Sequence, residues 1–397
     1  MNKNETSITQ IFLVFLKLGM TSFGGPVAHL GFFREEFVRH RRWMTEASYA
    51  DLVALCQFLP GPASSQVGYA IGLMRGGTAG GIAAWVGFTL PSAIMLIVFA
   101  YGVTTLGDMQ QSGWLQGLKI AAVAVVAKAL WGMATQLCPD GRRATMALVA
   151  AMAALVWMTA LTQILIIVSG GILGWLLYRH GVDSATEDSD TQIFSHRRGA
   201  TFLAAFFILL VGLPLLTANY PATNLQIFES FYRSGSLVFG GGHVVLPLLQ
   251  TEVVPNGWIT DDAFLAGYGA AQAVPGPLFT FAAYLGAAMA VGPGGLMGGL
   301  LALVAIFIPS LLLVQGALPF WAILRRAPAA QAALRGTNAA VVGILLAALY
   351  NPVWIKGIHG PHHFIIALGA FGLLQFWKVP PWLVVGLAMM AGMAFLK

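Results

Sequence analysis

The chain has 397 residues, of which 58% are apolar and only 9% are charged. Soluble globular proteins carry about 25% charged residues, so this composition excludes that class and predicts an integral membrane protein. The formal net charge of +6 lies mostly in short loops, which indicates membrane orientation rather than nucleic-acid binding. The two cysteines, Cys56 and Cys138, have no metal or redox spacing.

The apolar sequence contains two kinds of helix-breaking motif, Gly-Gly and Pro-Gly-Pro. The first apolar run, residues 8–20, leads into Phe23-Gly24-Gly25-Pro26 without a small-residue cleavage site, so we expect it to be retained rather than removed as a signal peptide. The second break is Pro60-Gly61-Pro62, with a later copy at Pro275-Gly276-Pro277. Proline lacks an N–H group and clashes with the preceding turn, so these triplets cannot continue a helix. At membrane depth, broken backbone is tolerated only where protein buries it or where it lines a cavity.

The breaks belong to an internal repeat. Phe23-Gly24-Gly25 aligns with Phe239-Gly240-Gly241 at an offset of 216, and the two Pro-Gly-Pro triplets align at an offset of 215. Further matched positions are Lys17 with Arg233, Trp43 with Trp258, Gln57 with Gln272, Tyr69 with Tyr284, and Pro91-Ser92 with Pro309-Ser310. This nearly constant register predicts a duplicated chain.

Each half is predicted to contain a Gly-Gly-broken segment, a Pro-Gly-Pro-broken segment, two full spans and two shorter apolar segments. The ranges are 8–33, 48–75, 79–106, 113–137, 143–160 and 161–178, then 225–250, 262–291, 294–318, 332–350, 361–377 and 381–396. The domains are therefore an amino-terminal repeat (8–180), a polar linker (181–198), an extra inverting span (199–218) and a carboxy-terminal repeat (225–397).

Loop charge predicts how the halves are oriented. If both broken segments of each half return to their starting side, the basic loops gather on one side. These loops contain Arg34, Arg39, Arg41, Arg42, Arg75, Arg142, Arg143, Arg179, Arg197, Arg198, Arg325, Arg326 and Lys378, and the opposite side receives Asp108, Glu252, Asp261, Asp262 and Lys356. The positive-inside rule makes the basic side cytoplasmic. We therefore predict an all-α polytopic membrane protein built as an inverted repeat, provided that residues 143–178 form two helices, with the linker cytoplasmic and Lys397 periplasmic.

The breaks are also the predicted oxyanion site. A half-helix that starts after each triplet presents free N–H groups and the positive end of its dipole, which bind oxyanions. Glycine turns allow close backbone approach, and serine hydroxyls and glutamine amides add neutral donors. The candidates are Ser22, Gly24, Gly25, Gln57, Pro60, Gly61, Pro62, Ser64, Gly240, Gly241, Gln272, Pro275, Gly276 and Pro277. The alternative is that these glycines and prolines only permit tight helix crossings.

Five charged or titratable residues complete the candidates. Lys17 and Arg233 lie six residues before the Phe-Gly-Gly turns, near mid-bilayer, where an unpaired cation is costly. We expect them to neutralise a divalent oxyanion; the alternative is snorkelling to the surface. His243 titrates near neutrality if it keeps an ordinary pKa. Glu36 and Glu252 are matched acids and candidates for proton coupling, with a solvated interface as the alternative.

These motifs closely resemble the chromate ion transporter family in its long, two-domain form. The first half carries Phe23-Gly24-Gly25-Pro26-Val27-Ala28-His29-Leu30, Trp43-Met44-Thr45, Gln57-Phe58-Leu59-Pro60-Gly61-Pro62 and Arg75-Gly76-Gly77. The second carries Val238-Phe239-Gly240-Gly241-Gly242-His243, Gly257-Trp258-Ile259-Thr260 and Gln272-Ala273-Val274-Pro275-Gly276-Pro277. The resemblance implies efflux of chromate across the bacterial inner membrane, driven by the membrane potential or proton gradient, and chromate resistance. It also matches Arg34 and Arg75 to basic positions of the family.

The residues themselves leave the substrate and direction open. Chromate and sulfate are tetrahedral dianions of similar size, which N–H donors and one cation hardly separate, and alternating access works in either direction. A passive anion channel would need a continuous pore. An enzyme would need a nucleophile with a base or a metal cluster, and the sequence offers no such grouping. We expect a transporter without cofactor or metal, whose partners are a small inorganic oxyanion and the lipid bilayer, with no nucleic acid; a homodimer is left open.

Overall fold

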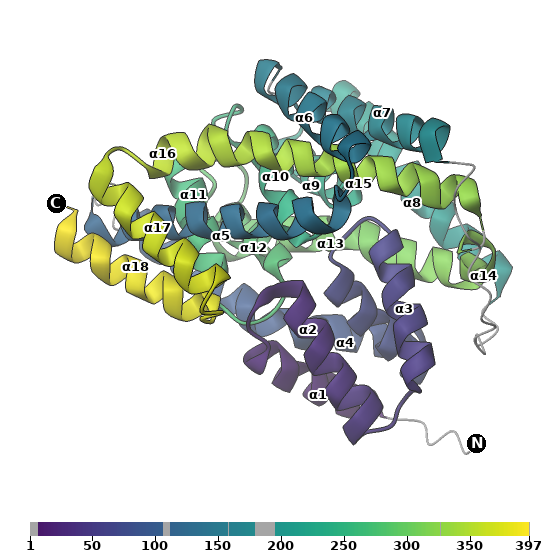
Figure 1. The fold of residues 1–397 in the computed structure, drawn as a ribbon. Coiled ribbons are helices and arrows are strands. Elements are labelled where there is room, and N and C mark those ends of the chain that lie inside the picture. Colours follow the sequence, from purple (N-terminus) through teal and green to yellow (C-terminus); the bar gives the residue numbers. More distant parts are fainter. Residues whose placement is uncertain (1–6, 106–111, 158, 179–194, 326, 397) are drawn as a thin grey trace.

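The computed structural model describes residues 7–105, 112–157, 159–178, 195–325 and 327–396. The first part contains α1 (Ile8–Thr21), α2 (Gly25–Arg34), α3 (Glu46–Phe58), α4 (Ala63–Thr105), α5 (Gly113–Leu137), α6 (Gly141–Val156), α7 (Ala160–Tyr178) and α8 (His196–Asn219). The second contains α9 (Thr223–Ser236), α10 (Val245–Val253), α11 (Asp261–Ala271), α12 (Phe281–Ala288), α13 (Gly295–Ala317), α14 (Trp321–Leu324), α15 (Pro328–Ala348), α16 (Ile355–Gly357), α17 (Pro361–Gln375) and α18 (Pro381–Phe395). Figure 1 shows their arrangement.

The predicted all-α membrane fold is confirmed. Within the described residues there is no β-strand, and six helices are long and apolar enough to cross a membrane. Residues 143–178 form two helices, α6 and α7, as the predicted parity requires. The extra span is present as α8, whereas residues 181–194 of the predicted linker, as well as Asp108, Arg326 and Lys397, lie outside the described residues.

The breaks lie at the predicted glycines and prolines. The chain leaves helical geometry at Gly24, whose φ is 101°, and at Gly241, whose φ is 145°. Helix α4 begins directly after Pro62, and a short turn at Leu278–Thr280 leads from Pro277 into α12. Glycine adopts these positive φ values without the steric cost that a Cβ atom would bring.

The predicted boundary after the Pro-Gly-Pro segment is present in both halves, with a different local form in each. The label α4 covers residues 63–105, but Gly76 and Gly77 have non-helical φ and ψ, so two helices meet there, as predicted. They pack against each other, because a Cβ on Gly72 would lie 2.4 Å from the Gly80 carbonyl oxygen. In the second half, the corresponding helices α12 and α13 are separate. The second half has a three-residue insertion here, with Pro293 between Gly292 and Gly294, which both have positive φ. The proline cannot continue α12, so the kink becomes a loop.

Each half packs one long helix against the last two helices of the other half. Helix α5 packs against α17 and α18 of the second half, and α15 packs against α6 and α7 of the first half. Glycines make both crossings close: a Cβ on Gly117 would lie 2.3 Å from the Ala388 carbonyl oxygen, and one on Gly336 would lie 2.1 Å from that of Gly170. Small residues allow this approach between helices in membranes. The matched contacts give the molecule an approximate two-fold symmetry.

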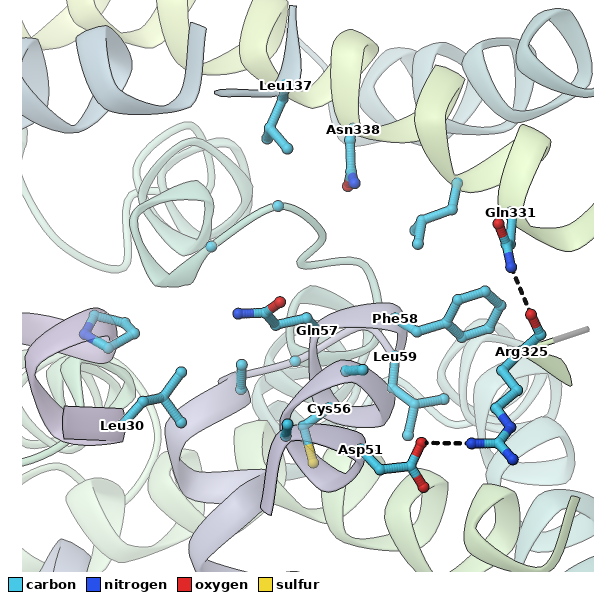
Figure 2. A pocket seen from close by; sticks show the side chains of 18 of the residues that line it. Leu30, Asp51, Cys56, Gln57, Phe58, Leu59, Leu137, Arg325, Gln331 and Asn338 are labelled. Atoms are coloured by element: carbon cyan, nitrogen blue, oxygen red, sulfur yellow. Dashed lines mark hydrogen bonds and ion pairs between the residues drawn. The ribbon is translucent and has the colours of Figure 1, made fainter. Parts of the chain in front are cut away.

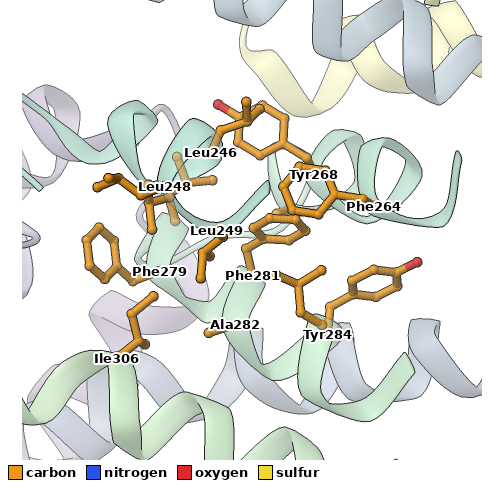
Figure 3. Packing of buried hydrophobic residues seen from close by; sticks show 14 of the residues in the cluster. Leu246, Leu248, Leu249, Phe264, Tyr268, Phe279, Phe281, Ala282, Tyr284 and Ile306 are labelled. Atoms are coloured by element: carbon orange, nitrogen blue, oxygen red, sulfur yellow. The ribbon is translucent and has the colours of Figure 1, made fainter. Parts of the chain in front are cut away.

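The short helices of the second half form a dense apolar core (Figure 3). Phe281 of α12 contacts Phe264 and Tyr268 of α11 edge-on, with ring centroids 5.2 and 5.6 Å apart. The Tyr284 hydroxyl donates a 2.8 Å hydrogen bond to the Ala263 carbonyl oxygen. Residues 264–271 of α11 are all buried, so this helix is enclosed on every side.

At the centre, each Pro-Gly-Pro break is hydrogen-bonded to the Gly-Gly break of the other half. The Gly61 N–H donates to the Val238 carbonyl oxygen at 2.7 Å, and the Gly276 N–H donates to that of Ser22 at 2.9 Å. Ser22 and Val238 are equivalent positions of the repeat, as are Gly61 and Gly276. Peptide groups exposed by the breaks are therefore satisfied by protein, as the membrane interior demands.

These crossings predict which glycines cannot be replaced. At Gly61, with φ 125°, a Cβ would lie 2.8 Å from Ser310 Cβ; at Gly276, with φ 92°, it would lie 2.8 Å from Ser92 Oγ. We expect Gly61→Val or Gly276→Val to abolish transport, because the side chain forces the two halves apart. Transport at matched expression is the measurement. Gly369→Val, where nothing lies within 4 Å, is the control and should be active; normal transport in either test variant would contradict the role of the crossing.

Candidate functional site

A cavity of about 1070 Å³ lies between α3 and α15 (Figure 2). Its wall contains the first Pro-Gly-Pro break, the second glycine turn and the end of α5. The lining residues are Pro26, Leu30, Ala47, Ala50, Asp51, Ala54, Cys56, Gln57, Phe58, Leu59, Gly61, Ala63, Gln136, Leu137, Gly240, Gly241, Gly242, Trp321, Arg325, Gln331, Leu334 and Asn338. Both repeats therefore contribute broken backbone to one space.

The polar lining is mostly uncharged. The side-chain amides of Gln57 and Asn338 extend into the space from opposite walls. Gln136 adds a third amide at the end of α5, and the Asn338 Oδ1 atom is buried without a hydrogen-bond partner. Because the two atoms of an amide are assigned from their surroundings, this end of Asn338 offers either an acceptor or, after a flip, a donor.

A charged pair borders the cavity on one side. Arg325 Nη1 lies 3.0 Å from Asp51 Oδ1, and the Trp321 indole N–H donates to the same oxygen at 2.8 Å. The Gln331 amide donates to the Arg325 carbonyl oxygen. The charges of Arg325 and Asp51 cancel, so this pair adds no net charge to the cavity. The remaining polar lining consists of neutral amides and of glycine backbone.

Four of the predicted site residues line the cavity: Gln57, Gly61, Gly240 and Gly241. The Gly61 N–H is bonded to Val238, whereas the N–H groups expected to bind the anion are those of the first turn of α4, at residues 63–65, of which Ala63 lines the cavity. The sequence analysis did not select Asn338, Gln136, Gln331 or Asp51. An asparagine inside the apolar stretch 332–350 is a signal that could have identified Asn338, because polar side chains within membrane spans are rare.

The other neutral candidates lie around the two breaks, outside the cavity lining. Ser22 is buried and gives its carbonyl oxygen to Gly276. Ser64 is buried beside His29, with 3.3 Å between Ser64 Oγ and His29 Nδ1. Gln272 Nε2 is buried without a partner, and His243 Nδ1 lies 2.8 Å from the Tyr268 hydroxyl. Gly24, Gly25, Pro60, Pro62, Pro275 and Pro277 flank the same breaks but are not among the lining residues.

The charged side chains at equivalent positions of the two repeats have different partners and different exposure. Arg233 lies 2.6 Å from Glu229 Oε1 and 2.7 Å from Glu252 Oε1, and both acids are buried. In the first half, Lys17 is exposed and Glu36 pairs with Arg41 at 2.6 Å. A dianion that approached Arg233 would meet two carboxylates, which oppose its binding there. Within the described residues, no three His, Cys, Asp or Glu side chains are grouped to hold a metal ion.

Comparison with known proteins identifies the family. The model of the Chromate transporter family matches residues 9–175 and 225–393, which are the two halves described above. The chain belongs to the chromate transporter family. It is therefore a multi-pass membrane protein of a transporter family, built from two homologous repeats.

Three relatives agree with this assignment. The chain is 27% identical to the "Chromate transport protein" of Pseudomonas aeruginosa, over 77% of this chain and 71% of that one. It is 26% identical to the "Probable chromate transport protein" of Synechococcus elongatus, over 98% and 96%. It is 25% identical to the "Chromate transport protein" of Cupriavidus metallidurans, over 98% and 94%. No solved structure matches the chain.

The geometry around Arg233 predicts a structural role. Arg233→Ala leaves two buried carboxylates without their counter-charge, so we expect it to lower the free energy of unfolding by about 3–5 kcal/mol. Adding Glu252→Gln should recover part of this loss, because it removes one of the stranded charges. Thermal melting in detergent is the measurement, and Arg198→Ala, an exposed cation, is the control.

The sequence-based expectation assigns these cations to the substrate. If Lys17 and Arg233 hold the oxyanion, alanine at either position removes more function than alanine at a loop cation such as Arg198. The affinity of the two alanine variants for chromate should then fall by roughly thirty- to a thousandfold, by analogy with a broken buried ion pair.

Proposed function

We propose that this protein is a secondary active transporter that exports chromate across the bacterial inner membrane and thereby confers chromate resistance. The observation that carries the proposal is the cavity between α3 and α15, to which both repeats contribute a helix break. Such a location is typical of transport sites, which lie where the discontinuous helices of two repeats meet. Membership of the chromate transporter family supports chromate as the substrate.

The cavity borders the predicted cytoplasmic side, where an exported anion would enter. The cavity is bordered by Arg325, which belongs to the basic loops predicted to be cytoplasmic. The repeat itself favours this orientation: Arg142-Arg143 at the start of α6 correspond to His362-His363 at the start of α17, at an offset of 220. Arginines in one copy and histidines in the other fit the positive-inside rule for an inverted repeat, because that rule counts Lys and Arg. The substrate would enter this cavity from the cytoplasm.

The chemistry of the lining suits an oxyanion that must be released again. Amides and glycine backbone stabilise negative charge by hydrogen bonding, without the strong attraction of an unpaired cation. Gly240 and Gly241 have no side chain that would keep a tetrahedral anion away from the main chain. The same neutral donors fit sulfate, so sulfate or another small oxyanion is the alternative substrate.

A passive channel is supported less well. It would need a continuous pore, whereas α11 and α5 pack closely on the side of the molecule that corresponds to the cavity in the other repeat. Coupling to the membrane potential or a proton gradient is part of our proposal, and Glu36 and Glu252 remain the candidate coupling residues.

Flux measurements test the proposal. In proteoliposomes, we expect chromate to accumulate only under an imposed potential or pH gradient, and sulfate to compete with it. Asn338→Ala and Gln57→Ala should each raise the KM by roughly ten- to a hundredfold, the value of one hydrogen bond to a charged ligand. Asn219→Ala, an exposed amide on α8, is the control.

Three results would contradict parts of this account. Dissipation of chromate without gradient-driven accumulation indicates a channel. Accumulation of sulfate but not chromate overturns the substrate, and unchanged kinetics in both amide variants overturn the cavity as the binding site.

A further inference from the structure

Equivalent pairs of helices are in contact in one repeat arrangement and separated by a cavity in the other. Helix α11 lies directly against α5, where a Cβ on Gly269 would be 2.5 Å from the Leu118 carbonyl oxygen and 3.4 Å from Leu118 Cβ. The equivalents of these helices are α3, at an offset of 215, and α15, at an offset of 219. Those two helices are separated by the cavity.

The residues that face the cavity are the counterparts of those in the closed contact. On α3, Asp51 and Ala54 line the cavity and correspond to Ala266 and Gly269 of α11. On α15, Leu334 and Asn338 line it and correspond to Leu115 and Lys119 of α5. Ala266, Leu115 and Leu118 form one buried apolar cluster. The open cavity and the closed contact are thus equivalent interfaces of the two repeats.

We propose that the contact between α11 and α5 is a second oxyanion cavity, closed in this conformation, which opens to the opposite side of the membrane when α3 closes on α15. That its ligand is an oxyanion rests on the proposed function. The conformational part rests on the difference between the repeats alone. Two states of one interface, populated in turn, give each side of the membrane access to the substrate without a continuous pore.

The closed cavity has its own polar groups. Gln272 corresponds to Gln57, and its Nε2 atom is buried without a partner in the described structure. Lys119 stands where the open cavity has Asn338, and its Nζ atom lies 2.8 Å from Asp262 Oδ1 with the lysine side chain 2% exposed. Opening would separate Lys119 from Asp262 and give the anion access to the Gln272 amide. An amide donor and a cation then face the space that receives the anion.

Two features hold this cavity shut. The first is the ion pair of Lys119 with Asp262, which joins the two helices directly and is protected from solvent at the lysine. The second is Gly269, because any Cβ there would fall within 3 Å of a main-chain oxygen. The corresponding residue of α3 is Ala54, and Thr337 corresponds to Leu118. In an α3–α15 contact of the same geometry, the Ala54 Cβ would therefore lie against the Thr337 carbonyl oxygen. Glycine at 269 and alanine at 54 therefore bias the protein toward the conformation described here.

Exchange of these two small residues is the test. The background carries Cys56→Ala and Cys138→Ala, with retained transport as a requirement. Single reporters are Ala50→Cys, which faces the open cavity, and Ala266→Cys, which is buried at the closed contact. A membrane-impermeant maleimide is applied to vesicles of either orientation, so that each reporter is labelled from a known side.

We expect Ala266→Cys to be protected in the background. Gly269→Ala or Asp262→Asn should raise its labelling at least about threefold, because each weakens the closed state relative to the open one. Ala54→Gly should lower the labelling of Ala50→Cys and raise that of Ala266→Cys, since α3 can then close. Gly386→Ala, where nothing lies within 4 Å, should change neither reporter.

Two results overturn the inference. One is protection of Ala266→Cys in all three variants, which means that the α11–α5 contact does not open. The other is a parallel rise of both reporters, which indicates local unfolding rather than exchange. Labelling needs no transported ion, so opposite changes in the two reporters without chromate or sulfate flux would keep the second cavity and reject the proposed function.

Discussion

The fold depends on two backbone hydrogen bonds that cross between the repeats. A helix break inside a membrane exposes peptide groups that no water can satisfy, at a cost of several kcal/mol for each group. Gly61 and Gly276 donate their N–H groups to Val238 and Ser22, so each half satisfies the break of the other. The exchange of α5 and α15 between the halves surrounds this centre. Neither repeat could bury its broken helices without the other.

This arrangement shifts where an anion can bind. The N–H groups of Gly61 and Gly276 are hydrogen-bonded between the halves, so they are not available to an anion. The groups that can bind it are nearby: the glycine turn at Gly240 and Gly241 and the amides of Gln57 and Asn338. Arg233 is engaged by two acids instead. In the cavity between α3 and α15, this neutral lining favours release of the anion, because a dianion held there by an unpaired buried cation would be slow to leave.

Much of this could be predicted from the sequence, because prolines, glycines and apolar length act locally. The repeat, the positions of the breaks, the two helices α6 and α7 and the membrane class all followed from such local signals. The boundary within α4 was predicted too, because Gly76 and Gly77 leave helical geometry, and only the longer loop around Pro293 differs in the second half. The partner of Arg233 was missed because the equivalent of Glu229 is Leu13, although Glu229 precedes Arg233 by one helical turn.

The open cavity was beyond sequence reasoning for a different reason. The aligned breaks and apolar segments of the two repeats predict the same helix contact in both halves. Which contact is open depends on small differences in packing, such as Gly269 against Ala54, whose effect appears only when the facing carbonyl oxygen is known.

The central claim is that the oxyanion binds in the cavity between α3 and α15. A crystal of the protein soaked with chromate, with diffraction data collected at the chromium absorption edge, tests it most directly. The account predicts an anomalous peak within hydrogen-bonding distance of the Gln57 or Asn338 amide and beside Gly240 and Gly241. A peak beside Arg233 or Lys17, with none in the cavity, would contradict it.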